Sequence, residues 1–470
     1  MRRSSYKDIP LQVVGQSYEH RSKALSVQKT MNLIPQSELT GAAQTSLTSW
    51  PGYKSFYDTS GNGVNRGMTV FKDELYKITN TSLFKITSVG AAVYIGSIPG
   101  EKRCIFANDG TNLIITTNGV GYQYDSTNLT QITDSDFQGG NSVAFFNLLA
   151  VCDGFDNSFQ FSNIGNPDTF DAADIANAEA NPDDTNRVFV FRDQLYVCGE
   201  KTIETWYYNA ATNPPANRVQ NATMQVGIGA IHSMQATDEF VYFLGDDRRV
   251  YRFSATQPQN ITTIAISHQL DKLGDLSDAI GDIVRIEGQS FYILTAQGKT
   301  FAYNEEANAW FNLSTKADEE AYPLNSFVEC YGKRLAANGA DVVELDLDTY
   351  DNGGDVMINE RIFGPITASS LGLGSSRVMM SSIYFDIEAG VGLTSGQGEN
   401  PQLMVSASYD GGRSYDNERD VLLGRAGEGR LVVKWDNCAS FKTMYVRVRC
   451  SDPVFISIFG ATLKAKAGGY

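Results

Sequence analysis

The sequence predicts an all-β protein that consists of a β-propeller of about seven blades followed by a C-terminal β-sandwich. Three observations support this fold class. The 470 residues include 43 Gly, 23 Tyr and 25 Phe, which favours short strands and tight turns over long helices. A hairpin written FKDELYKI at residues 71–78 returns as FRDQLYVC at residues 191–198. Strands after residue 354 alternate apolar and polar side chains, as half-buried antiparallel strands do.

The recurring hairpin predicts a propeller over residues 45–354. Its return strand can be aligned seven times, at intervals of about 35 to 50 residues, and most copies are followed by a short turn and another strand. Four short strands per interval is the pattern of a propeller blade, although the uneven spacing leaves six or eight blades open, and a sandwich or solenoid of ordinary hairpins is the competing fold. The predicted return strands are residues 75–78, 113–116, 148–151, 195–198, 241–244, 291–294 and 334–337.

Two segments do not fit the repeat. Residues 1–44 form an extended N-terminal arm, in which residues 11–14 are expected to supply a strand that closes the propeller. Residues 165–186 lengthen one blade and are predicted to be an inserted loop with a helical turn, which could reach a neighbouring protein.

A turn-rich break, DNGG at residues 351–354, marks the start of a second domain over residues 355–470. A β-sandwich is the natural packing for its half-buried strands. The predicted strands are residues 381–387, 402–408, 430–435, 444–449 and 454–458.

Charge and cysteine usage narrow the class of protein. A formal charge of -16 argues against a protein that coats nucleic acid, but an acidic surface suits DNA that must pass without sticking, so a lumen with little affinity for DNA is expected. A basic stretch occurs at Met1, Arg2 and Arg3, with Lys7 nearby; a solvated terminus is favoured over an arm that binds an acidic partner. Six separated cysteines predict reduced, buried thiols and folding in a cytosol, and neither a signal peptide nor a membrane-spanning run is found.

The sequence offers no catalytic set, so we assign no catalytic, cofactor-binding or metal-ligating residue and expect no enzyme and no cofactor. His20, His232 and His268 are far apart. Residues 226–231 (VGIGAI) are predicted to be a blade-to-blade turn rather than a dinucleotide loop. Residues 408–415 (SYDGGRSY) resemble the Asp-box turn of sialidase-like propellers, a structural element. Carboxylates near hairpins are interpreted as turn-forming residues rather than calcium ligands, namely Asp109, Asp153, Asp246 and Asp247.

Several segments taken together resemble the packaged-DNA stabilisation proteins of short-tailed bacteriophages, also called tail accessory factors or tail hubs. The likeness extends over most of the chain in the same order. It rests on MNLIP at residues 31–35, SWPGY at 49–53, NRG at 65–67, FRDQL at 191–195, TIETWY at 202–207, QVGIG at 225–229, SASYDGG at 406–412 and RVR at 447–449.

The resemblance implies a role in the virion rather than a reaction. Such proteins join the tail as a hexameric ring below the portal and its adaptor proteins, seal the filled head and retain its DNA, which passes through the channel without sequence-specific binding. They also offer docking surfaces to tailspikes or fibres and to the central needle. The expected location is the virion tail, assembled in the host cytoplasm. The alternative function is a propeller that binds or cleaves glycans, such as a sialidase relative or a depolymerase, which should show converging carboxylates or arginines on one face.

Overall fold

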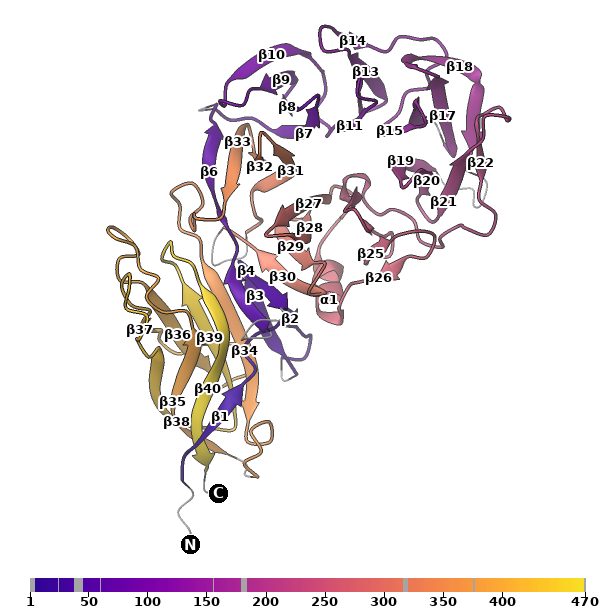
Figure 1. Ribbon diagram of the computed structural model, residues 1–470. Helices are drawn as coiled ribbons and strands as arrows, with labels where there is room; N and C mark the ends of the chain where they lie inside the picture. The colour runs from indigo at the N-terminus through magenta and orange to yellow at the C-terminus, as the bar shows by residue number, and fades with distance from the viewer. Residues whose placement is uncertain are drawn as a thin grey trace.

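A ring of four-stranded blades and an elongated β-sandwich make up the two parts of the chain (Figure 1). This computed structural model describes residues 5–23, 25–37, 45–59, 61–154, 156–178, 184–315, 320–374 and 377–468. The basic stretch at residues 1–3 lies outside this described part of the chain. None of the described helices is long and apolar enough to cross a membrane.

Among the described residues the ring has seven blades, each of four antiparallel strands with the first strand innermost, so the predicted propeller is confirmed. The four strands of the sixth blade belong to a larger sheet. The seven predicted return strands are the second strands of the blades. In blade order the strands are β7 (Asn65–Phe71), β8 (Glu74–Thr79), β9 (Ser82–Ile86) and β10 (Ala92–Ser97); β11 (Ile105–Asn108), β12 (Leu113–Thr117), β13 (Val120–Tyr124) and β14 (Leu129–Gln131); β15 (Val143–Phe146), β16 (Leu149–Asp153), β17 (Ser158–Asn163) and β18 (Asn166–Asn177); β19 (Thr185–Phe191), β20 (Gln194–Gly199), β21 (Ile203–Tyr208) and β22 (Ala216–Arg218); β23 (Gln235–Ala236), β24 (Val241–Leu244), β25 (Val250–Phe253) and β26 (Gln259–Asn260); β27 (Ile280–Ile286), β28 (Gln289–Ala296), β29 (Lys299–Asn304) and β30 (Ala309–Leu313); and β31 (Leu324–Cys330), β32 (Lys333–Asn338), β33 (Asp341–Asp346) and β6 (Gly52–Tyr57).

The motif that recurs in the sequence forms the hairpin between the first and second strands of a blade. In the fourth blade Phe191 pairs with Gln194, and the two residues between them, Arg192 and Asp193, have φ angles of 48° and 60°. The corresponding residues of the first blade, Lys72 and Asp73, have φ angles of 51° and 59°. Two consecutive left-handed residues form the type I′ turn, whose twist matches that of the flanking strands.

This turn geometry predicts which of two substitutions at Asp193 gives the more stable protein. Asp193→Gly should be more stable than Asp193→Ala by about 1 kcal/mol, because glycine adopts the left-handed conformation without the steric cost that alanine meets. Urea unfolding of the two variants measures the difference. At exposed Glu101, where the backbone is not left-handed, the same pair of substitutions should rank in the opposite order. Equal stability of the two Asp193 variants would contradict the turn assignment.

The ring is closed by β6, a strand from the N-terminal side of the propeller region. It pairs with β33 as the outer strand of the seventh blade, and the inner strands β31 and β7 lie side by side across the seam. The buried Lys77 ammonium also crosses the seam, where it donates hydrogen bonds to the carbonyl oxygens of Gly339, Ala340 and Asp341 at 2.7, 2.8 and 2.8 Å. The prediction that residues 11–14 close the propeller is therefore wrong. β1 (Lys7–Leu11) pairs instead with the last strand of the sandwich, which already offers it a free edge.

One local prediction fails in the propeller, and one helix was not predicted. Residues 166–177, predicted as part of an inserted loop with a helical turn, form β18, the outer strand of the third blade. Its Asp, Ala and Asn residues are poor strand formers, but backbone pairing with β17 overrides that preference. Residues 179–183 of the same segment lie outside the described residues. Conversely, α1 (Ile264–Lys272) was not predicted; Thr263 caps its N-terminus by accepting a hydrogen bond from the Ile266 N–H at 3.2 Å.

The sandwich consists of two sheets that enclose one apolar core, with Trp435 and Leu463 among its buried residues. The N-terminal arm contributes strands to both sheets. Residues 430–433 and 454–456 are not strand as predicted; the strands there begin at Lys434 and Ser457. One sheet contains β1, β4 (Leu33–Ser37), β5 (Thr45–Ser49), β35 (Val378–Ile387), β38 (Lys434–Phe441) and β40 (Ser457–Ala467); the other contains β2 (Tyr18–Glu19), β3 (Val27–Met31), β34 (Asn359–Thr367), β36 (Gln402–Ser408), β37 (Arg419–Leu422) and β39 (Thr443–Cys450).

Candidate functional site at the joint between propeller and sandwich

The segment MNLIP connects the two parts of the molecule. On one side of β3, Met31 pairs in parallel with Asn312 of β30, the outer strand of the sixth blade. On the other side, residues 29–31 pair with residues 360–362 of β34, so one continuous sheet runs from the propeller into the sandwich. After Asn32 the chain enters β4, which belongs to the opposite sheet of the sandwich. We call residues 27–37, with the side chains that bind them, the joint.

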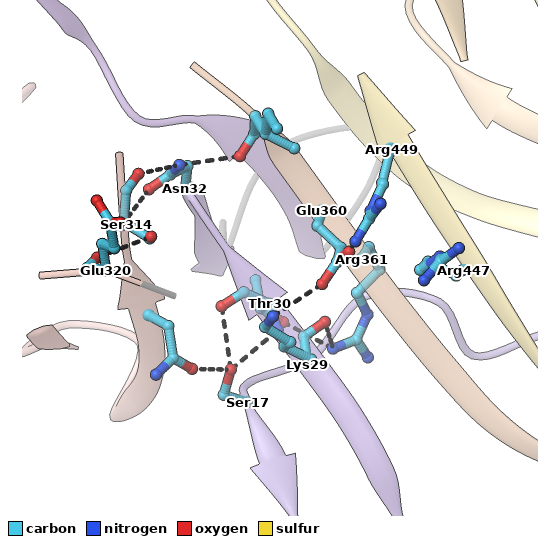
Figure 2. Close-up of polar contacts among 12 residues, drawn as sticks. Ser17, Lys29, Thr30, Asn32, Ser314, Glu320, Glu360, Arg361, Arg447 and Arg449 are labelled. Atoms are coloured by element: carbon cyan, nitrogen blue, oxygen red, sulfur yellow. Dashed lines mark hydrogen bonds and ion pairs between the residues drawn. The ribbon is translucent and has the colours of Figure 1, made fainter. Parts of the chain in front are cut away.

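Asn32 makes the turn between β3 and β4 and binds both parts of the molecule (Figure 2). Its φ is 55°, a left-handed conformation that asparagine tolerates better than most residues. Its side-chain Nδ2 donates to the carbonyl oxygens of Ser314 and Ile358 at 2.8 and 2.9 Å, and its Oδ1 accepts from the Ser314 N–H at 3.0 Å. These bonds connect the end of the sixth blade to the start of the sandwich.

Arg361 of β34 holds the N-terminal arm against the sandwich. Its side chain is 0 % exposed, and its guanidinium donates to the Val13 carbonyl oxygen at 2.7 Å, to Thr30 Oγ1 at 2.7 Å and to Gln28 Oε1 at 2.6 Å. Weaker bonds reach the carbonyl oxygens of Gln16 and Lys29. Burial lowers the pKa of Arg361 to about 9. A buried cation is costly unless its donors are satisfied, and here neutral oxygens of the arm satisfy them.

A cluster of ion pairs lies beside Arg361 on the same sheet. The buried Glu360 carboxylate pairs with Lys29 of β3 at 2.9 Å and with Arg449 of β39. Figure 2 shows Lys29, Glu360 and Arg449 on three neighbouring strands. Glu418 extends the cluster by pairing with Arg449 at 3.4 Å and with Arg447 at 3.1 Å. These charges bind the arm strand to the sandwich rather than forming an open reactive site.

An apolar cluster fills the propeller side of the joint. Trp50 is completely buried and contacts Phe291 and Phe311 of the sixth blade and Tyr322 of the segment that leads to the seventh, with ring centroids 5.4, 5.8 and 6.4 Å away. Its indole N–H donates to the Tyr322 hydroxyl at 3.2 Å. Ile34 and Tyr53 belong to the same cluster. Polar and apolar contacts together connect the propeller to the sandwich at the joint.

Other segments that carried the resemblance also lie at contacts between strands or blades. Arg66 of the NRG segment is buried and donates to the carbonyl oxygens of Lys102 and Ile98, both at 2.6 Å, and so connects the first blade to the second. A Cβ at Gly67 would lie 2.5 Å from the Phe106 ring. Within TIETWY, buried Glu204 accepts a hydrogen bond from Trp206 Nε1 at 2.9 Å and pairs with Arg218 at 3.2 Å. These side chains therefore stabilise the propeller.

A cavity of about 400 Å³ lies at the centre of the propeller, lined by its inner strands and called here the axial cavity. Its charged side chains are Arg103, Arg187 and Asp282, with His232 beside them. Arg187 is 6 % exposed, and burial lowers its pKa to about 10. Burial raises the pKa of Asp282 to about 6, although Arg103 opposes that shift. The sequence does not reveal that these residues meet at one cavity; the signal it offers is a charged residue at or just before the inner strand of several blades.

His232 should make stability depend on pH. Burial and the positive charges of Arg103, Arg187 and Lys102 lower its pKa to about 3, whereas an unfolded histidine has a pKa of about 6.5. Between these values the unfolded chain binds a proton that the folded chain does not, so stability falls as the pH drops below 6.5. Between pH 7.5 and 5.0, His232→Gln should lose about 2 kcal/mol less unfolding free energy than the parent protein. Urea unfolding at the two pH values checks this, and equal losses would contradict it.

The remaining sequence-derived candidates are structural. A Cβ on Gly227 would lie 2.1 Å from the Glu200 backbone and one on Gly229 would lie 2.5 Å from the Gly245 carbonyl oxygen, which confirms the predicted close-approach turn at residues 226–231. In the Asp-box-like segment, the Asp410 carboxylate accepts from the backbone N–H groups of Arg413 and Ser414 at 2.9 and 3.0 Å, so the predicted turn role is also confirmed.

The predicted turn role of the other carboxylates is confirmed in two cases, because Asp109 accepts from Asn112 N–H and Asp247 from Arg249 N–H. Asp246 instead accepts from the N–H of Gly227, 19 positions earlier in the chain. Asp153 differs because it is buried on β16 and accepts from both the N–H and the hydroxyl of Ser142, at 2.6 and 3.0 Å.

The histidines and cysteines are dispersed. His20 lies in the arm, where it accepts a hydrogen bond from Ser22 N–H at 2.9 Å, and His268 lies on α1, so neither joins His232 at the axial cavity. Within the described ranges, no three His, Cys, Asp or Glu side chains gather as a metal site would. All six cysteines are free thiols; five are buried, as predicted, and Cys438 is exposed.

Comparison with known proteins gives a family and distant structural likenesses. The extracellular domain of BT4673 from B. thetaiotaomicron matches with 10 % identity and a TM-score of 0.43, covering 73 % of this chain, which spans 45 % of that chain's length. The Pan2 WD40 domain of Neurospora crassa matches with 11 % identity and a TM-score of 0.40, covering 63 % of this chain and 94 % of that one. The comparison with curated proteins found no match.

A family model assigns the chain to a family. A family model described as Bacteriophage P22 Gp10, beta-propeller, matches residues 7–350, which include residues 27–37 of the joint and the strands of the seven blades. The chain therefore belongs to the bacteriophage P22 Gp10 β-propeller family, whose members are phage structural proteins that stabilise packaged DNA.

Proposed function

We propose that this protein is the hub of a short phage tail, which joins the portal and its adaptor proteins to the distal tail. In this role it seals the filled head, retains the packaged DNA and docks the tailspikes or fibres and the central needle. The observation that carries the proposal is the joint. A load on the sandwich reaches the propeller through a continuous sheet, the Asn32 bonds and the buried Trp50 cluster.

Copies of the chain would assemble into a closed ring, expected to be a hexamer, on the adaptor proteins in the host cytoplasm. Heterologous contacts close into a ring when the rotation between neighbours divides a full turn. A rigid two-part subunit suits this assembly, because each subunit can present the propeller and the sandwich to different neighbours. The net charge of -16 supports passage of DNA through the ring without tight binding.

The proposed role is structural and not enzymatic. The carboxylates and arginines at the joint are bound to one another or to backbone oxygens, so they support the protein's shape. The Asp-box-like turn uses its carboxylate to hold its own backbone. No cofactor enters this proposal.

Electron microscopy of the purified protein, alone and with a portal–adaptor complex, tests the proposal. We expect closed rings seated on the adaptor. A control with Arg413→Gln, a change confined to the exposed Asp410 turn, should form the same rings. A protein that stays monomeric with the adaptor present would overturn the hub assignment, and cleavage of a capsule glycan by that monomer would replace it with a glycan-cleaving function.

A further inference from the structure

The axial cavity holds more positive than negative charge. Arg103 and Arg187 line it together with one carboxylate, Asp282, which is 7 % exposed. Neither arginine forms an ion pair with a carboxylate of the described residues: Arg103 donates to the neutral Ser326 Oγ at 2.9 Å and to Asn325 Oδ1 at 3.4 Å. Arg187 donates to the Ile231 carbonyl oxygen. In a chain with a net charge of -16, this local excess of positive charge requires an explanation.

Arg187 also has unused hydrogen-bonding capacity. Its Nε is buried and has no hydrogen-bond partner among the described residues, although its side chain lines the cavity. A buried cation without a carboxylate partner is costly, and a negatively charged ligand beside it lowers that cost. A guanidinium presents a planar fork of donors that matches the oxygens of carboxylates and phosphates.

We propose that the axial cavity binds a small free oxyanion of the phosphate or carboxylate class between Arg103 and Arg187. The volume of about 400 Å³ lies within the range of small-molecule sites. Arg103 lies two positions before β11 of the second blade and Arg187 lies on the inner strand of the fourth, so an anion bound to both would bridge distant blades. His232 and Ser326 add polar groups to the wall. Asp282, on the inner strand of the sixth blade, opposes binding by its charge and so sets the affinity.

The bound anion would stabilise the disc. It neutralises the buried guanidinium groups and connects blades that do not otherwise contact one another through paired strands. A ligand that binds the folded state alone raises stability with each increase in its concentration. This inference does not depend on the tail-hub proposal, because it concerns the chain by itself.

Calorimetric titration of the full chain with inorganic phosphate at pH 7.5, against sodium chloride at matched ionic strength, tests the proposal. We expect a dissociation constant of about 1 mM or tighter, and a thermal unfolding midpoint that rises with phosphate. Sodium acetate forms the second arm: tighter binding of phosphate identifies the phosphate class, and binding of acetate equal to or tighter than that of phosphate identifies the carboxylate class.

Variants make the test specific to the cavity. Asp282→Asn keeps the side-chain size but removes the opposing charge, and should bind the anion about ten-fold tighter. Arg103→Gln and Arg187→Met should each bind about ten-fold more weakly; if Arg187→Met fails to fold, the Asp282 and Arg103 variants still decide the matter. Arg192→Gln removes an arginine from an exposed hairpin turn and should leave affinity unchanged. The proposal is overturned if neither anion binds, if Asp282→Asn does not bind more tightly, or if Arg192→Gln weakens binding as much as Arg103→Gln.

Discussion

Replacing Arg361 with methionine is expected to weaken the attachment of the N-terminal arm by about 4 kcal/mol. Methionine fills part of the same volume, but it leaves the Val13 carbonyl oxygen, Thr30 Oγ1 and Gln28 Oε1 without the donor that satisfies them. Buried oxygens that lose a charged donor cost more than the apolar side chain returns. Hydrogen exchange of the β3 and β34 amides measures this local loss directly, because opening of the arm exposes these amides.

Two further variants separate the hydrogen bonds of Arg361 from its charge. Arg361→Lys keeps the charge but offers fewer donors in a different geometry, so its loss should fall between those of the parent and Arg361→Met. Arg413→Met removes an arginine that bonds to the Asp410 carbonyl oxygen in an exposed turn, and should change stability by less than about 0.5 kcal/mol. If Arg361→Met exchanged its β3 amides as slowly as the parent, the arm would not depend on this guanidinium.

Asn32→Ala is expected to destabilise the joint by about 4 kcal/mol and to loosen the sandwich against the propeller. The change removes the partners of the Ser314 and Ile358 carbonyl oxygens and of the Ser314 N–H. It also forces alanine into a φ of 55°. Particle images of the purified variant should show a wide spread of angles between its two parts, whereas the parent should show one angle.

Asn32→Gly divides this effect into its two causes. Glycine accepts the left-handed backbone but supplies no side-chain hydrogen bonds, so it should recover about 1 to 2 kcal/mol of the loss. Urea unfolding of the three proteins gives the comparison. If alanine and glycine at this position were equally stable, the backbone conformation of Asn32 would not contribute, and if both matched the parent the joint would not depend on Asn32 at all.

The blades could be predicted from sequence because each repeats a local hairpin. The sequences of residues 71–78 and 191–198 each specify a two-residue turn and two strands that pair with each other, so no distant partner is needed. Ring closure could not be read in the same way, since β6 pairs with residues 342–346, almost 300 positions away. β18 was missed because its composition is that of a loop, and only its pairing with β17 makes it a strand.

The joint and the axial cavity were harder to predict from the sequence than the strands, because both form only through tertiary structure. MNLIP was recognisable through its resemblance to a family, but its role follows from strand pairing on both sides of β3. Arg103, Arg187 and Asp282 are separated by many residues and meet only because the propeller brings its inner strands to one axis. Arg361 is surrounded by a residue pattern typical of any half-buried strand, and nothing in that pattern indicates a completely buried guanidinium.

Retention of DNA by filled phage heads tests the central claim most directly. Heads filled in the absence of this protein are incubated with or without the purified chain, and the DNA that remains resistant to nuclease is measured. We expect heads alone to lose their DNA, the parent protein to restore retention, and Asn32→Ala to restore it less well than Arg413→Gln. Heads that keep their DNA without the protein would contradict the proposed tail-hub role.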